Sequence, residues 1–262
     1  MSEEEIKIQN AVEPAEEVIV PIDEAKIEKT REDVDMWKPV SDLGRKVKSG
    51  EITDLNIIFD RGLKIKESKI VDALLDNAES DLINIGQSKG KFGGGKRKAF
   101  KQTQKKTNEG NKPKFATFAI VGNRNGFVGL GYGKTKETVP AREKALRNAK
   151  LNLMRIRRGC GSWQCGCKTP HSIPYQVEGA CGSVRIVLRP APKGTGLKIE
   201  KECQKILSLA GIKDVWAKRY GQARNKINLV KACEQALKKL STTKVQEKFS
   251  ESLGIVDGSK VK

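Results

Sequence analysis

The spacing of apolar residues predicts a chain of mixed helices and strands. Apolar positions repeat at helical intervals in four segments, at about Glu67–Ala78, Pro140–Ile156, Ile199–Ala210 and Asn228–Leu240. Short apolar or alternating runs typical of strands occur in six segments, at Asp81–Gly86, Phe115–Gly122, Phe127–Gly133, Tyr175–Gly179, Val184–Leu188 and Val215–Tyr220. The expected fold class is therefore α+β.

The order of these segments predicts two domains. A helix, three strands and a second helix lie within residues 37–158, and the Asn-Gly pair that ends Asn123–Gly126 predicts a hairpin between the last two strands. A second domain, an α/β sandwich, is expected over residues 175–240. The remaining segments are expected to be an acidic flexible tail, a connecting loop rich in Cys and Gly, and a polar tail, at residues 1–36, 159–174 and 241–262.

The charge of the chain narrows the classes of partner. The formal net charge is +19, and residues 1–35 alone hold 12 acids against 4 bases, so residues 36–262 hold 47 bases against 20 acids. Such an excess destabilises a compact protein unless a polyanion neutralises it. No apolar run approaches the roughly 18 residues of a membrane span. Nucleic acid is therefore the expected partner.

The segment Gly86–Lys114 is the strongest candidate for RNA contact. It joins two predicted strands, holds ten bases and one acid, and is far longer than a hairpin turn requires. Phe92 and Phe100 lie among the lysines, where they could stack on bases. The alternative is a solvated, mobile charge run. The bases expected to contact RNA are Lys89, Lys91, Lys96, Arg97, Lys98, Lys101, Lys105, Lys106, Lys112 and Lys114, with Arg124 and Lys134 outside the segment.

The segment GLGYGKT, Gly129–Thr135, imitates the end of a nucleotide-binding loop. That motif requires a glycine five residues before Gly133, and position 128 is Val. The glycines also lie inside a predicted strand, where they let another backbone approach closely. The sequence therefore favours a packing role over nucleotide binding.

Three cysteines and the single histidine of the chain lie within twelve residues, as Cys160, Cys165, Cys167 and His171. Thiolates and an imidazole are suited to a tetrahedral zinc site, although the spacing is not that of two C-x2-C knuckles. Two alternatives stay open: ordinary loop cysteines, and a Cys–His nucleophilic pair, for which no orienting third residue is evident. Cys181 is a reserve ligand, and Cys203 and Cys233 are expected in the core. No other cofactor is expected.

Three segments, taken together, resemble the universal small-subunit ribosomal protein five family. They are FATFAIVGNRNGFVGLGYGKT, VRIVLRPAPKGTGL and LAGIKDVWAKRYG, at residues 115–135, 184–197 and 209–221. The resemblance extends over residues 37–240. The acidic tail and the Cys-rich insert favour the archaeal and eukaryotic branch, closest to the archaeal form.

This resemblance implies a fold and a function. The first domain would resemble a double-stranded-RNA-binding fold, and the second a fold that also occurs in some small-molecule kinases. The chain would be a structural constituent of the small ribosomal subunit, ribosome-bound in the cytoplasm, that binds ribosomal RNA, shapes the messenger RNA entry region and influences translational accuracy. Its expected partners are small-subunit ribosomal RNA, messenger RNA at the entry channel and neighbouring proteins including universal protein four, with no membrane.

Two other functions compete with this interpretation. A free double-stranded-RNA-binding protein would read any duplex by shape, through phosphates and 2′-hydroxyls. A basic phosphotransfer enzyme would need a phosphate-binding loop rich in glycine and serine, which the sequence lacks. The chain is therefore not expected to be an enzyme.

Overall fold

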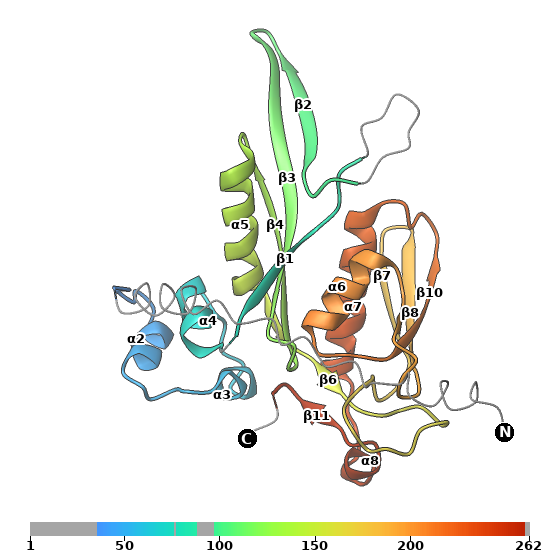
Figure 1. The fold of residues 1–262 in the computed structure, drawn as a ribbon. Coiled ribbons are helices and arrows are strands. Elements are labelled where there is room, and N and C mark those ends of the chain that lie inside the picture. Colours follow the sequence, from blue (N-terminus) through green and yellow to red (C-terminus); the bar gives the residue numbers. More distant parts are fainter. Residues whose placement is uncertain (1–35, 76, 88–96, 260–262) are drawn as a thin grey trace, which may run out of the picture. The chain divides into compact units, whose positions relative to one another are not determined.

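The structure is a computed structural model that describes residues 36–75, 77–87 and 97–259, of which residues 38–259 belong to one compact unit. The predicted acidic tail therefore falls almost entirely outside the described residues, as does the part of the predicted RNA-contacting loop that contains Lys89, Lys91 and Lys96. The described fold is α+β, which confirms the predicted class (Figure 1).

Three short helices and a five-stranded antiparallel sheet form the first half of this unit. The helices are α2 (Asp42–Lys48), α3 (Leu55–Asp60) and α4 (Ser68–Leu74). The strands are β1 (Glu79–Ile83), β2 (Lys101–Thr107), β3 (Gly110–Gly122), β4 (Phe127–Thr135) and β5 (Leu153–Arg155). They follow the order β1-β3-β4-β5, and β2 pairs with the far end of β3. The pairing of β3 with β4 across Asn123–Gly126 confirms the predicted hairpin.

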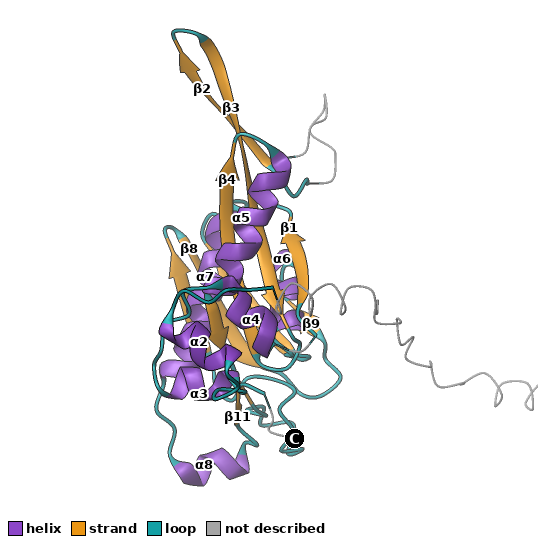
Figure 2. Ribbon diagram, turned by 90° about the vertical axis from the view of Figure 1, so that its left-hand side faces the viewer, coloured by secondary structure: helices purple, strands orange, loops and turns teal. Residues whose placement is uncertain are grey.

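The helix α5 (Thr138–Leu151) lies close against this sheet, where β4 presents Gly129, Gly131 and Gly133 to it (Figure 2). Cβ atoms added at Gly129, Gly131 and Gly133 would lie 2.2, 2.1 and 2.2 Å from the carbonyl oxygens of Ala149, Ala145 and Ala141. The glycines of GLGYGKT therefore admit a helix backbone, and the packing role that the sequence favoured is confirmed.

The structure corrects the expectation of a long loop without regular structure over Gly86–Lys114. Its second half is a β-hairpin, in which β2 pairs in register with an N-terminal extension of β3. This arm, Lys101–Lys114, projects beyond the rest of the sheet (Figure 1). Apolar alternation could not reveal it, because its residues are polar on both faces and almost all exposed.

A second sheet and two helices form the other half. The strands β7 (Val177–Cys181), β8 (Val184–Pro190), β9 (Leu197–Lys198) and β10 (Val215–Tyr220) follow the order β7-β8-β10-β9. The helices α6 (Lys201–Leu209) and α7 (Lys226–Thr242) pack against each other, α7 against β7 and β8, and α6 against β1, β3 and β4. One core cluster therefore includes Phe118 and Leu130 from the first sheet together with Ile186 and Leu188 from the second. The division into two domains at residues 159–174 stays a prediction.

Residues 241–259 are not the plain polar tail that the sequence suggested. After α7 ends at Thr242, the chain forms α8 (Glu247–Ser252) and β11 (Val256–Asp257), which pairs with β6 (Arg157–Arg158). Arg157 donates to both carboxylate oxygens of Asp257, at 2.7 and 3.0 Å, and this pairing raises the pKa of Arg157. The buried Arg158 donates to the carbonyl oxygen of Gly258. These bonds are made to residues about 100 positions away, so local sequence gives no sign of them.

The ends of two predicted elements also differ from the observed ones, because of contacts with residues far away in the sequence. The predicted strand Asp81–Gly86 begins at Glu79 and stops at Ile83, because the amide N–H of Asn84 donates to Glu202 of α6 at 2.9 Å. The predicted helix that was to reach Ile156 ends at Leu151, where the chain turns so that β5 can pair with β4. None of the helices in the described part of the chain has the length and apolar character that crossing a membrane requires.

Candidate functional site

The Cys-rich segment is a loop between β6 and β7, and backbone hydrogen bonds join its two ends. Gly159 and Ser172 exchange two backbone hydrogen bonds of 2.9 Å, and the amide N–H of Gly161 donates to the carbonyl oxygen of Ile173. The amide N–H of Cys160 donates to the carbonyl oxygen of Leu253, so the segment after α8 also supports the loop. The residues from Cys160 to His171 are thus folded back on themselves.

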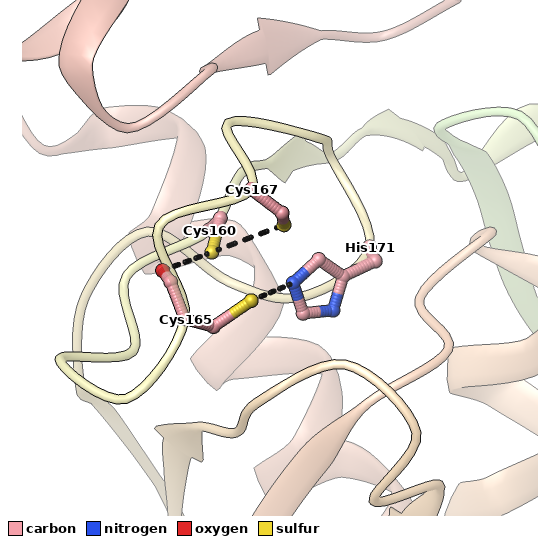
Figure 3. A group of neighbouring side chains, drawn as sticks. All are labelled: Cys160, Cys165, Cys167 and His171. Carbon is pink, nitrogen blue, oxygen red and sulfur yellow. Dashed lines mark hydrogen bonds between the residues drawn. The ribbon is translucent and has the colours of Figure 1, made fainter.

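This fold brings the four predicted metal ligands together (Figure 3). The sulfur atoms of Cys160, Cys165 and Cys167 and a ring nitrogen of His171 all lie within 4.8 Å of one another. The Sγ atoms of Cys160 and Cys167 are 3.6 Å apart, and Cys165 Sγ is 3.8 Å from His171 Nε2. Two thiolates at the corners of a tetrahedral zinc site are separated by about 3.8 Å, given a Zn–S bond of about 2.3 Å. The four groups can therefore hold a metal ion with little rearrangement.

The surroundings shift the pKa values of two of the clustered thiols in opposite directions. Burial and the neighbouring thiols raise the pKa of Cys160 to about 11. A hydrogen bond with the hydroxyl of Thr169, 3.0 Å away, lowers the pKa of Cys167 to about 6. Neighbouring thiolates repel one another, so a nearby positive charge would stabilise the ionised forms of Cys160 and Cys167. A divalent metal would supply that charge.

Asp214 supports the cluster from behind by contacting His171, and the sequence gave no indication of this contact. Its Oδ2 lies 2.8 Å from Nδ1 of His171, and both side chains are about 95% buried. Its Oδ1 accepts the amide N–H of Gly196 at 2.8 Å. A carboxylate on Nδ1 favours the tautomer whose Nε2 lone pair is free, and this arrangement is usual behind a metal-binding histidine. Only the fold brings Asp214 to a histidine 43 positions earlier.

The Asp214 carboxylate also supplies a group that the alternative of a nucleophilic cysteine requires. His171 contacts Cys165 through Nε2 and Asp214 through Nδ1, so an orienting third residue does exist. The 3.8 Å between Cys165 Sγ and His171 Nε2 is within hydrogen-bond reach for sulfur, so this distance alone does not decide between the two functions. Two further thiols also crowd the imidazole. The geometry favours metal binding over nucleophilic catalysis.

The other three cysteines lie outside this cluster. Cys203 in α6 and Cys233 in α7 are fully buried in the core, as predicted. Contact with Cys233, together with burial, raises the pKa of Cys203. Cys181 ends β7, and it is not among the clustered ligands, so the expectation of a reserve ligand gains no support.

The basic residues of the arm lie mostly on one side. Residues paired across antiparallel strands share a face, and faces alternate along each strand. By this rule one face carries five lysines, here called the lysine face: Lys101, Lys105, Lys112, Lys114 and Lys134. Lys105 lies directly opposite Lys112, although like charges in that position are destabilising. The only acid of the segment, Glu109, neutralises one of these charges through an ion pair with Lys112.

The remaining predicted RNA-contacting residues are more dispersed. Lys106 is exposed on the opposite face of the arm. Lys98 is exposed, and Arg97 donates to the carbonyl oxygen of Arg224 at 3.2 Å. Arg124 lies in the β3–β4 turn with a φ of 53°, where its guanidinium pairs with Glu79 at 2.8 Å. The lysine face is thus the densest group of positive charge among the predicted residues that the structure describes, even though Lys112 is paired with Glu109.

Two family models match the chain, one in each half of the described fold. Residues 99–157 match the family model "Ribosomal protein S5, N-terminal domain", and residues 179–249 match "Ribosomal protein S5, C-terminal domain". These matches agree with the two-domain α/β arrangement expected from the sequence.

Several archaeal proteins named small ribosomal subunit protein uS5 are similar over nearly their whole length. The protein of Nanoarchaeum equitans is 47% identical over 226 residues, which cover 86% of this chain and 97% of the relative. The protein of Methanocaldococcus jannaschii is 46% identical over 228 residues, which cover 87% and 98% of the two chains. That of Methanosphaera stadtmanae is 45% identical over 224 residues, which cover 86% and 92%. The chain belongs to the uS5 family of small-subunit ribosomal proteins.

Proposed function

We propose that this protein is a structural constituent of the small ribosomal subunit that binds ribosomal RNA. The observation that carries the proposal is the lysine face, which concentrates five cations on an exposed surface. Cations opposed across strands gain from a polyanion that neutralises them, and phosphate contacts supply most of the affinity for nucleic acid. The arm would reach into the RNA while the two-sheet body stays outside it.

The family assignment supports a further position on the ribosome. The protein would act in the cytoplasm, at the region where messenger RNA enters, and would influence translational accuracy from there. Its neighbours would include other small-subunit proteins, among them universal protein four. In this role the chain is a binding and architectural protein, and no chemical step is assigned to it.

We also propose that Cys160, Cys165, Cys167 and His171 bind one structural zinc ion. The support is the convergence of three thiols and an imidazole at tetrahedral separations, with Asp214 behind the imidazole. A bound zinc would close the loop with four protein ligands and leave no position for water or substrate. It would fix the segment that leads into the second sheet, because the loop joins β6, which pairs with β11, to β7.

RNA binding by the full chain should weaken steeply as salt rises. Each neutralised phosphate contributes about 0.9 to the slope of log affinity against log salt on duplex DNA, and a similar value is expected on RNA. If the lysine face engages its five positions, the slope should be about −4 or steeper. Filter binding to small-subunit ribosomal RNA across a salt series measures it. An affinity independent of salt would contradict the electrostatic account.

Adjacent lysines on the arm give a matched comparison. Lys105→Ala should weaken RNA binding and make the salt slope shallower by about 0.9, because Lys105 belongs to the lysine face. Lys106→Ala should change either quantity much less, since Lys106 points to the opposite face. Both residues are exposed, so each variant should keep its stability within about 0.5 kcal/mol. Equal losses of affinity in the two variants would show that total charge, and not the face, determines binding.

A further inference from the structure

The second sheet has one face that no helix of the described chain covers. The helix α7 packs on the face of β7 and β8 that carries Gly179, Ile186 and Leu188. A Cβ at Gly179 would lie 2.0 Å from the carbonyl oxygen of Ala232 in α7, which fixes that side as the inner one. Residues of the opposite parity therefore point outward, and Figure 1 shows this sheet at the right-hand edge of the molecule.

Most of the outward residues are aromatic or basic, and they surround Val187, which is buried. Strand pairing places Trp216, Lys218 and Tyr220 of β10 beside Arg189, Val187 and Arg185 of β8. On the other side of β10, Lys198 of β9 lies next to Trp216. We call this surface the aromatic–basic face and define it by Arg185, Arg189, Lys198, Trp216, Lys218 and Tyr220. It is separate from the lysine face, which belongs to the first sheet.

The aromatic rings of this face are available for contact. Trp216 is 37% exposed and Tyr220 is 39% exposed, which is unusual for large rings within a strand. Arg185 lies over the Tyr220 ring at 5.1 Å from its centroid, and Lys218 lies 5.5 Å from the same centroid. Both cations lie over the Tyr220 ring, so a base that stacks on this ring would displace them from it and leave them free to contact its phosphate. An exposed ring flanked by cations is the arrangement that receives a nucleic-acid base together with its phosphate.

The charges of the face favour RNA over a protein partner. Four bases lie on it against one acid, Glu178, which is 3.8 Å from Arg185. The centre of a protein–protein interface is depleted of lysine, whereas Lys218 here occupies the middle of the face, between Trp216 and Tyr220. Rings that stack on bases require bases released from a duplex, so the complementary partner is single-stranded.

We propose that the aromatic–basic face binds a single-stranded segment of RNA, with bases stacked on Trp216 and Tyr220 and phosphates on Arg185, Arg189, Lys198 and Lys218. This inference rests on the proposed function, because it assigns a second RNA contact to the same protein. It differs from the arm in kind: the lysine face neutralises phosphates of any RNA, whereas this face selects unpaired bases.

Two RNA probes distinguish the two surfaces in the full-length protein. Trp216→Leu should weaken binding of a short unstructured oligouridine by about ten-fold, the loss expected for one stacked base, and should leave duplex RNA binding unchanged. Trp216→Phe keeps an aromatic surface and should bind oligouridine nearly as the parent does. Trp163→Leu removes a ring that is 90% exposed outside this face, and it should have no effect on oligouridine.

The outcomes separate this inference from the proposed function. If Trp216→Leu and the parent bind oligouridine equally while Lys105→Ala weakens duplex binding, the aromatic–basic face is not an RNA site and the proposed function stands. If the parent binds neither RNA, both fail. Should Trp216→Leu prove unstable, the cross-linking experiment below decides the matter.

Cross-linking in assembled small subunits identifies the partner directly. A photoreactive benzoylphenylalanine at position 216 should form adducts with unpaired nucleotides of ribosomal RNA. Adducts with another protein, or with base-paired RNA, would overturn the inference. The same group at position 105 serves as the control, because the arm should cross-link to RNA whether or not the second face does.

Discussion

Protein purified without chelator should contain one zinc ion per chain, and removal of the ion should cause a large loss of stability. At a zinc concentration about 1,000-fold above its dissociation constant, a single site contributes about 4 kcal/mol to the free energy of unfolding. Without the ion, the loop from Cys160 to His171 is held only by its protein contacts, such as the backbone hydrogen bonds between Gly159 and Ser172. Its three crowded thiols would then have no cation to stabilise them. Elemental analysis and thermal unfolding with and without chelator measure both effects.

Three variants test which residues hold the ion. Cys165→Ser should reduce zinc to well below one atom per chain, whereas Cys181→Ser, which changes a cysteine outside the cluster, should retain it. Asp214→Asn should still bind zinc, but about 10- to 100-fold more weakly, because it loses the carboxylate that orients His171. A zinc-free parent that unfolds identically with and without chelator would leave the cysteines as ordinary loop residues.

The second large effect should come from the glycine strand under α5. A Cβ at position 131 would lie 2.1 Å from the carbonyl oxygen of Ala145 and 2.2 Å from the amide nitrogen of Ala149, and neither backbone atom can move without the helix. Gly131→Val should therefore destabilise the fold by about 3 kcal/mol or more. Denaturant unfolding of the zinc-loaded protein measures the change.

The control for this prediction is another glycine with free space around it. Nothing lies within 4 Å of a Cβ added at Gly166, and its backbone is not in the left-handed region. Gly166→Ala should therefore leave stability nearly unchanged. If Gly131→Val and Gly166→Ala unfold at the same denaturant concentration, the helix does not pack on β4 as closely as described.

Local pattern predicted the elements whose residues alternate between a core and solvent. Val215–Tyr220 was predicted with its observed bounds, and the β3–β4 hairpin followed from Asn-Gly between two apolar runs. The arm was missed because neither of its faces is apolar, so its sequence lacks the alternation of apolar and polar residues that predicts a strand. The C-terminal segment was missed because Arg157, Arg158 and their partners are distant in sequence.

The candidate sites divide in the same way. Residue type and crowding were sufficient to predict that Cys160, Cys165, Cys167 and His171 would lie together, since all four are within twelve positions. Asp214 and the sharing of one face by Lys105 and Lys112 depend on strand pairing and on the packing of distant segments. The aromatic–basic face likewise emerges only when β8 and β10 are placed in register. Composition indicated a polyanionic partner, but only the fold separates two surfaces that could meet it.

The most direct test of the central claim is sedimentation of the protein from its own cells through a salt-washed gradient. A structural constituent of the small subunit should appear with small subunits and assembled ribosomes, at one copy per subunit, and should be nearly absent from the free protein fractions. A free double-stranded-RNA-binding protein would instead remain at the top of the gradient and bind any RNA duplex with uniform affinity. Stoichiometric co-sedimentation is the result that this account predicts, and a free protein with uniform duplex affinity is the result that would contradict it.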